Sequence, residues 1–353
     1  MKQYSIAVIA GDGIGREVIP LGIEVIESTA RAFDFSFKWN HFPWGSEYYF
    51  QNGRMMPADA LDQLRRFDAI YLGAVGHPQI QDNVTLNGLL LPIRRGFDQY
   101  ACVRPAVLYE GIDSPLAGRK AGEIDMVIVR ENTEGEYAQI GGNLYSQTSQ
   151  EVAIQSAVFT RRGTERIIRF AFELARKRNR KRRVTSVTKS NAQGYSMEFW
   201  DRVFKEVADC CPDIETESLL VDAACMDLIR RPQMFDVIVA SNLFGDILSD
   251  VSAMITGSLG LAPSANLNPE RQFPSMFEPV HGSAPDIAGQ ERANPLAAVL
   301  AGAMMLEFLG EIEASQRMEA AVQAVLREGK TLTPDLNGSA RSAEVAFAVK
   351  DLI

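Results

Sequence analysis

Short apolar runs alternate with longer amphipathic stretches along the whole chain. The runs that read as strands lie at residues 4–10, 69–74, 125–130, 183–187 and 235–240. Helical spacing marks residues 59–67, 89–99, 161–178, 295–309, 312–327 and 342–352. Strands that alternate with helices in this way predict an α/β fold.

A glycine-rich turn follows the first predicted strand, before a helical pattern that runs to about residue 32. Its sequence is Gly11-Asp12-Gly13-Ile14-Gly15, but Arg16 stands where a dinucleotide fingerprint needs its third glycine. No acidic residue follows at the usual distance. We therefore interpret the segment as a tight turn and do not expect a Rossmann fold.

Length and composition are those of a globular protein large enough for two domains. The 353 residues are 46% hydrophobic and 23% charged, with a formal net charge of -9 that argues against a general nucleic-acid binder. No apolar stretch is long enough to span a bilayer, and the first residues lack a signal-peptide pattern. The four cysteines have neither metal-ligand spacing nor a secretory framework, which favours the cytoplasm.

The segment 241–250 carries a pair of acids directly after an apolar strand. If it is helical, Asp246 and Asp250 lie on one face and could hold a divalent cation. A solvated polar face with two unrelated acids is the alternative. We expect the neighbouring apolar stripe to seat this helix in a core; it consists of Ile247, Leu248, Val251 and Met254.

Further polar residues stand at the ends of predicted strands or on short helices. Arginines bind carboxylates through a fixed two-pronged geometry, and hard cations prefer oxygen ligands. Together these residues would suit a dicarboxylic hydroxy acid held against a metal. They are Arg94, Arg104, Arg130, Tyr137, Lys189, Asp222, Asp246 and Asp250.

Seven motifs, in order, resemble those of the β-decarboxylating dehydrogenases, the family of isocitrate and isopropylmalate dehydrogenases. They are Leu91-Pro92-Ile93-Arg94-Arg95, Val103-Arg104-Pro105, the segment 129–137, Thr188-Lys189-Ser190-Asn191, Val221-Asp222-Ala223-Ala224, the segment 242–250 and the segment 278–289. The resemblance covers essentially the whole chain. It implies two α/β domains that share one continuous mixed sheet.

The resemblance also implies roles for the site residues. Arg94, Arg104 and Arg130 would bind the carboxylate shared by the family's substrates. Asp246 and Asp250 of one subunit, with Asp222 of its partner, would ligate Mg²⁺ or Mn²⁺. Lys189, also from the partner, would accept the hydroxyl proton, and Tyr137 would protonate the enol after CO₂ leaves. A homodimer with shared active sites is therefore expected, and a monovalent cation such as K⁺ is an additional candidate.

The cofactor implied by the resemblance is NAD. Asp286 would accept hydrogen bonds from the ribose hydroxyls and repel the additional phosphate of NADP. Small residues around it would let the backbone approach the adenosine. The expected cofactor residues are Asn191, Glu278, His281, Gly282, Ser283, Ala284, Asp286, Ile287 and Asn294.

The residues before Arg94 indicate the substrate. Gly88 and Leu90 replace the serine and asparagine of isocitrate enzymes, and Asn87 replaces the glutamate of isopropylmalate enzymes, although Leu90 would suit an isopropyl group. Other segments resemble tartrate and D-malate dehydrogenases most. We expect D-malate or tartrate as substrate, with 3-isopropylmalate as the alternative. A non-catalytic regulatory subunit is a remote second alternative.

The resemblance further implies a domain division. Residues 1–98 and 257–353 would form the cofactor-side domain, and residues 99–256 the dimerisation and metal-side domain. An arm at about residues 138–156 would clasp the partner subunit.

Overall fold

The computed structural model describes residues 2–353 and separates them into two compact units. The first unit contains the described residues up to Gln99 together with Val103–Asp125 and Ser252–Ile353. The second contains Tyr100–Cys102 and Met126–Val251. The segment 103–125, which the sequence placed in the second domain, thus clusters with the first unit.

Ten strands form one mixed sheet, in the order β2-β1-β3-β12-β11-β4-β5-β10-β8-β9. The pairs of β1 with β2 and β3, and of β10 with β5 and β8, are parallel, whereas β11 and β12 are antiparallel. The expected α/β fold with a mixed sheet is confirmed. The strands are β1 (Lys2–Gly11), β2 (Phe35–His41), β3 (Ala69–Ala74), β4 (Ala101–Val107), β5 (Asp125–Glu131), β8 (Arg183–Thr188), β9 (Glu215–Leu220), β10 (Val237–Ala240), β11 (Pro263–Leu267) and β12 (Ser275–Pro279).

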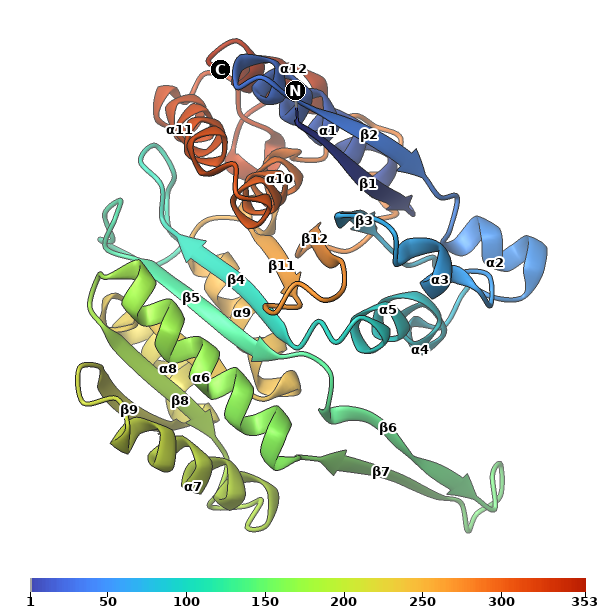
Figure 1. Cartoon of the computed structure of the whole chain (residues 1–353), viewed down its shortest axis with the longest axis vertical. Helices are drawn as coiled ribbons and strands as arrows, with labels where there is room; N and C mark the ends of the chain where they lie inside the picture. Colours follow the sequence, from blue (N-terminus) through green and yellow to red (C-terminus); the bar gives the residue numbers. More distant parts are fainter. Residues whose placement is uncertain (1) are drawn as a thin grey trace. The chain divides into compact units, whose positions relative to one another are not determined.

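In the first unit, long helices gather near both chain termini (Figure 1). These are α1 (Gly15–Ala32), α10 (Leu296–Leu309), α11 (Ile312–Glu328) and α12 (Ser342–Lys350), and α10 also packs on β11 and β12. Helix α10 is apolar on nearly all sides because it is buried between the sheet and its neighbouring helices.

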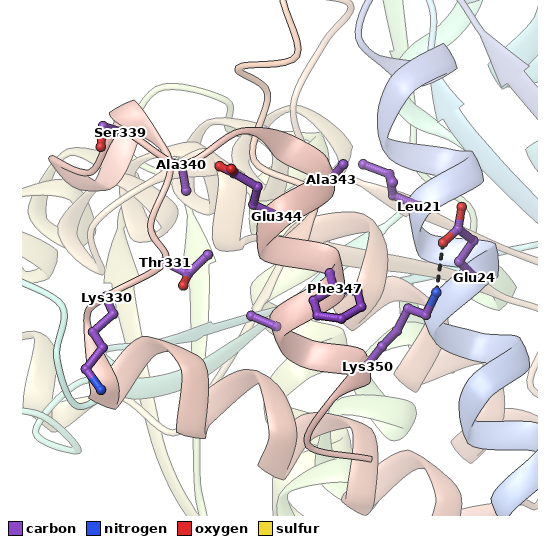
Figure 2. A pocket seen from close by; sticks show the side chains of 11 residues that line it. Leu21, Glu24, Lys330, Thr331, Ser339, Ala340, Ala343, Glu344, Phe347 and Lys350 are labelled. Carbon is purple, nitrogen blue, oxygen red and sulfur yellow. Dashed lines mark hydrogen bonds and ion pairs between the residues drawn. The ribbon is translucent and has the colours of Figure 1, made fainter.

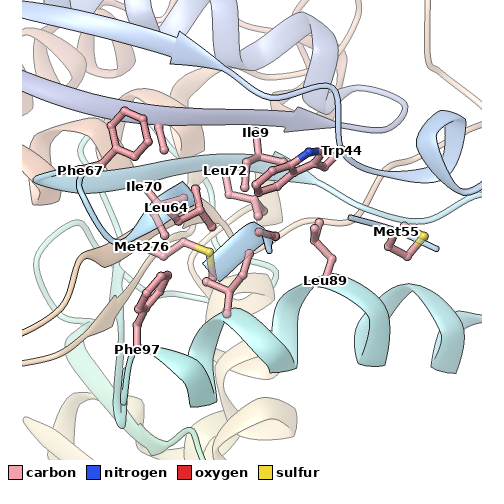
Figure 3. Close-up of a cluster of buried hydrophobic side chains, with 13 residues drawn as sticks. Ile9, Trp44, Met55, Leu64, Phe67, Ile70, Leu72, Leu89, Phe97 and Met276 are labelled. Carbon is pink, nitrogen blue, oxygen red and sulfur yellow. The ribbon is translucent and has the colours of Figure 1, made fainter. Parts of the chain in front are cut away.

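A cluster of buried hydrophobic side chains supports the segment that carries Asn87, Leu90 and Arg94 (Figure 3). It joins Ile9 of β1, Leu72 of β3 and Met276 of β12 to residues of the segment that precedes Arg94. That segment was predicted as one helix at 89–99 but consists of α4 (Asp82–Thr85), a π-helical turn η1 (Leu86–Leu90) and α5 (Leu91–Gly96). The unit also contains the short helices α2 (Ser46–Asn52) and α3 (Ala60–Leu64), of which α3 is shorter than the predicted 59–67, and the 3-10 turns η3 (Leu259–Leu261) and η4 (Pro334–Leu336).

A groove of about 860 Å³ runs between α1 and α12 (Figure 2). Leu21 and the ion pair of Glu24 with Lys350, at 2.9 Å, lie on one side of it, and Phe347 projects from α12. None of the sequence-predicted site residues lines this groove.

The second unit packs α6 (Arg161–Arg178) and α7 (Ser196–Asp209) on β8. Helix α6 has the predicted bounds because Thr160 caps its first turn by accepting a hydrogen bond from Gly163 N, and Asn179 ends it in a left-handed conformation. Trp200 of α7 is fully buried and donates to Ser186 Oγ at 2.9 Å. The chain continues through α8 (Val221–Arg230), the 3-10 turn η2 (Pro232–Met234) and α9 (Asn242–Ile255), whose residues from Ser252 onward cluster with the first unit.

Strands β6 (Gly135–Leu144) and β7 (Val152–Val158) form a separate antiparallel hairpin that projects from this unit (Figure 1). It occupies the segment expected to form an arm. Apolar side chains stand exposed on it, among them Ile140, Leu144 and Ile154, each more than half accessible.

Candidate active site

Arg94, at the end of α5, is buried and paired with Glu278 of β12. Its Nη2 lies 2.8 Å from Glu278 Oε1, which also accepts from Asn266 Nδ2 at 2.8 Å. The Nε atom of Arg94 is buried with no hydrogen-bond partner. The structure therefore joins the predicted substrate arginine directly to a predicted cofactor residue.

Asn87 and Leu90 lie on the π-helical turn before Arg94. Asn87 is exposed and Leu90 is half-buried, whereas Leu89 between them is anchored in the core. A Cβ atom at Gly88 would come within 2.6 Å of Cγ of the buried Met55. The burial of Leu89 thus anchors the turn in the core, and no side chain fits at position 88 unless Met55 moves.

Arg104 of β4 is also buried, and its Nε donates to Ser264 Oγ at 3.4 Å. The hydrogen bond to Ser264 of β11 therefore helps to fix the orientation of the Arg104 guanidinium.

In the second unit, Arg130 is the centre of a network. It is 1% exposed, and its Nε and Nη2 donate to Asn242 Oδ1 at 3.1 and 2.7 Å. Its Nη1 pairs with Asp246 Oδ1, and Tyr137 Oη donates to Asp246 Oδ2 at 2.9 Å. Gly245 makes this packing possible, because a Cβ there would lie 2.6 Å from Arg130 Cβ.

Glu136 holds the beginning of α9 against the hairpin. Its two carboxylate oxygens accept from Ser241 Oγ at 2.7 Å and from Leu243 N at 3.1 Å. A carboxylate that accepts a free amide at a helix start is stabilising. Sequence reasoning quoted Glu136 within a motif but gave it no role; its position in that motif was the available signal.

Lys189 and Asp222 form a second pair, with Nζ and Oδ1 2.9 Å apart. The hydrogen bond from Lys189 lowers the pKa of Asp222 below its usual range. The Asp222 side chain is largely exposed, as are Asp250 and Asn191. Within residues 2–353, no three His, Cys, Asp or Glu side chains are grouped closely enough to hold a metal, so Asp222 does not join Asp246 and Asp250 in one chain.

One expectation for α9 was wrong. Leu248 is fully buried, but Ile247 and Met254 are 47% and 50% exposed. Only part of the apolar stripe packs in the core of this chain. The helix therefore also presents apolar side chains to solvent.

The predicted cofactor loop begins at His281. Its Nε2 is buried without a hydrogen-bond partner, and burial lowers the pKa of His281, which favours the neutral ring. Gly282 has open space around its Cβ position, and Ala284 has a φ of 40°. Ile287 N donates to Ala284 O at 3.1 Å, and this turn leaves the Asp286 side chain exposed.

Asn294 closes the loop at the start of α10. Its Oδ1 accepts from Leu296 N at 3.0 Å, and its Nδ2 donates to Asp335 Oδ2 at 3.0 Å. Asp335 Oδ2 also accepts a hydrogen bond from Ser258 Oγ, so this carboxylate joins Asn294 to the segment that precedes β11. Sequence reasoning missed Asp335, which lies in no recognised motif and meets Asn294 only in the folded chain.

Among the described residues, no helix is both long and apolar enough to cross a membrane.

Comparison with known proteins identifies the family. The model of isocitrate/isopropylmalate dehydrogenases matches residues 5–351. The chain belongs to this family. A similar protein is the D-malate dehydrogenase (decarboxylating) of Escherichia coli strain K12, which is 51% identical over all of this chain and 99% of that protein. A tartrate dehydrogenase/decarboxylase of Pseudomonas putida is 48% identical over 99% of this chain and 98% of that one.

The family fold is confirmed by a crystal structure of isocitrate dehydrogenase from Methylococcus capsulatus. The two chains superpose with a TM-score of 0.89 at 38% identity and cover 99% of each other. The chain therefore has the isocitrate/isopropylmalate dehydrogenase fold expected from its motifs, and it is a dehydrogenase by membership of the family.

Proposed function

We propose that the protein catalyses the NAD- and divalent-metal-dependent oxidative decarboxylation of D-malate, tartrate or both. The observation that carries this proposal is the network of Arg130, Tyr137 and Asp246. It brings together a carboxylate-binding guanidinium, a proton-carrying phenol and a cation-binding carboxylate. The full-length relatives named for D-malate and tartrate support the same chemistry.

The π-helical turn supports the substrate class. Isocitrate enzymes carry a serine where Gly88 stands, and here a side chain at this position would collide with Met55. Asn87, exposed on the same turn, offers hydrogen bonds rather than bulk and suits a hydroxylated substrate. Leu90 supports the alternative, a 3-isopropylmalate dehydrogenase, because it could contact an isopropyl group.

The carboxylates fit a hard divalent cation by donor type. Asp246 and Asp250 would provide oxygen ligands from one chain and Asp222 from a partner, which suits Mg²⁺ or Mn²⁺. Asp246 already accepts two hydrogen bonds, so a bound cation would share its oxygens with Arg130 and Tyr137. A monovalent ion such as K⁺ is part of the proposal, although no residue is assigned to it.

The loop of residues 281–294 has polar groups and open backbone space that suit the binding of NAD. His281 Nε2 is buried and lacks a partner, Gly282 leaves space beside the backbone, and Asp286 is exposed. Asp286 would accept from ribose hydroxyls and disfavour a phosphate at that place. Asn191, Ser283, Ala284, Ile287 and Asn294 complete the proposed set, with Glu278 held by Arg94.

Two side chains would move protons. A bound nicotinamide would accept a hydride, and a bound cation would stabilise negative charge on the substrate oxygen. Lys189, held by Asp222, would accept the hydroxyl proton during oxidation. Tyr137, held by Asp246, would deliver a proton to the substrate carbon after the carboxylate has left as CO₂.

A homodimer would complete the site. The exposed apolar side chains of α8 and α9 include Met226 and Ile229 at 57% and 55% accessibility, together with Ile247. Burying such a face against a second copy is favourable. The exposed hairpin β6–β7 would clasp that copy. We place the protein in the cytoplasm, where the four free cysteines stay reduced.

A single assay tests the function. Purified protein is mixed with D-malate, the tartrate isomers, 3-isopropylmalate or isocitrate, with NAD or NADP, and NADH or NADPH formation is followed. Activity on D-malate or tartrate with NAD, abolished by EDTA and restored by Mn²⁺, is expected. Dominant activity on isocitrate with NADP would refute both assignments, and no activity on any substrate would favour the non-catalytic subunit.

A further inference from the structure

The beginning of helix α1 holds the loop that is proposed to bind NAD at two places. We propose that Glu17, with the glycine turn before it, is a positioning residue that fixes this loop for cofactor binding. This inference rests on the proposed use of NAD and assigns a role to a segment that the sequence predicted to be a tight turn.

The first point of attachment is at Ser283. Ile14 N donates to Ser283 O at 2.9 Å, so the turn directly supports the loop backbone. Gly13 has a φ of 52°, and a Cβ there would lie 2.0 Å from Ser283 O. Only glycine permits this approach, which gives Gly13 a reason other than phosphate binding.

The second point of attachment lies beyond Asp286. Glu17 Oε1 accepts from Gly289 N at 2.5 Å, and Oε2 accepts from Glu291 N at 3.2 Å. Both bonds join an ionised carboxylate to backbone amides, the stronger kind of hydrogen bond. Asp286 thus lies between two points at which the loop is attached to the same helix start.

This arrangement predicts where the effect of Glu17 will be seen. If a loop becomes ordered only when the ligand binds, the conformational entropy that it loses weakens binding. A loop that is already ordered in the free protein does not carry this cost. Glu17 contacts the loop backbone rather than the reacting groups. Its loss should therefore weaken cofactor binding without slowing the chemical step at saturating NAD.

The test uses the full-length protein with Glu17→Ala, Glu17→Gln and Glu24→Ala. Glu24 is a matched control because it lies on the same helix and pairs with Lys350 beside the groove of Figure 2. For Glu17→Ala, the Kd for NADH by fluorescence titration and the KM for NAD should rise about 5- to 30-fold. The kcat and the KM for the hydroxy acid should stay within about twofold, and Glu17→Gln, which keeps one acceptor oxygen, should be intermediate.

Hydrogen exchange in the protein without cofactor measures directly whether Glu17 protects the loop amides. Backbone amides of residues 286–291 should exchange faster in Glu17→Ala than in the wild type or in Glu24→Ala. Unchanged NADH affinity, or affinity losses equal in Glu17→Ala and Glu24→Ala, would overturn the positioning role. Failure of the wild-type protein to bind NADH would instead refute the proposed cofactor, while the exchange rates would still report whether Glu17 holds the loop.

Discussion

Glu278→Gln should destabilise the first unit far more than the loss of an exposed acid. Arg94 and Glu278 are 4% and 6% exposed and lie 2.8 Å apart. The substitution keeps an acceptor oxygen for Arg94 but removes the charge. Because it leaves a buried guanidinium without an ionised partner, we expect a cost near the lower end of the range for broken buried pairs, about 3 kcal/mol.

The assay is thermal unfolding, with urea unfolding as a second probe. For a unit of this size, about 3 kcal/mol corresponds to a fall in Tm of about 6–12 °C. Glu24→Gln is the matched control, because Glu24 is 56% exposed and pairs with Lys350 at 2.9 Å on the surface, where such pairs contribute about 0–1 kcal/mol. A fall in Tm no larger for Glu278→Gln than for Glu24→Gln would refute the reasoning from burial.

A double-mutant cycle separates the pair from its surroundings. Arg94→Met removes the buried charge while keeping an apolar side chain of similar length. The double variant with Glu278→Gln should lose about 2 kcal/mol less than the sum of the two single losses, because no unpaired charge remains. Additive losses would show that the two side chains act independently.

Three further substitutions test other parts of the structure. Gly245→Ala should displace Arg130 and lower kcat/KM at least about tenfold, whereas Gly142→Ala, in open space, should be nearly neutral; steady-state kinetics decides. Burial raises the pKa of Glu131 to about 7, so its stabilising contribution is complete below pH 4.5 and disappears as the pH rises through 7. The unfolding free energy of wild type relative to Glu131→Gln should therefore fall by about 3 kcal/mol from pH 4.5 to 8, measured by urea unfolding at each pH. Ile229→Asp should convert a dimer into monomers in sedimentation experiments and reduce Mn²⁺ affinity; an unchanged mass would contradict a dimer through this face.

Elements with strong local signals could be predicted closely from the sequence. Residues 69–74 form β3 with the expected bounds because all six residues are buried and read as one apolar run. Helix α6 was found from its amphipathic pattern. Strands β2 and β9 were missed because each is an edge of the sheet and combines polar with apolar residues. The π-helical turn was missed because hydrogen-bond register leaves no mark on hydrophobic spacing.

The candidate site residues were assigned from motifs, but their pairings could not be predicted in that way. Arg94 and Glu278 are 184 positions apart, and Lys189 and Asp222 are 33 apart. Such contacts depend on which strands become neighbours in the sheet, and local patterns do not specify this. The same limit explains why Asp335 was not recognised as a partner of Asn294.

A dimer would explain two features together: the exposed apolar side chains of α9, and the separation of Asp222 from Asp246 and Asp250 within one chain. Ile247 was expected in the core, yet it is exposed on the helix that carries Asp246 and Asp250. Asp222 lies on α8, which exposes Met226 in the same way. A second copy packed on these two helices would bury the apolar side chains and bring Asp222 of one chain to the acids of the other. Under that arrangement, subunit association and metal binding favour each other, because each stabilises the state that the other requires.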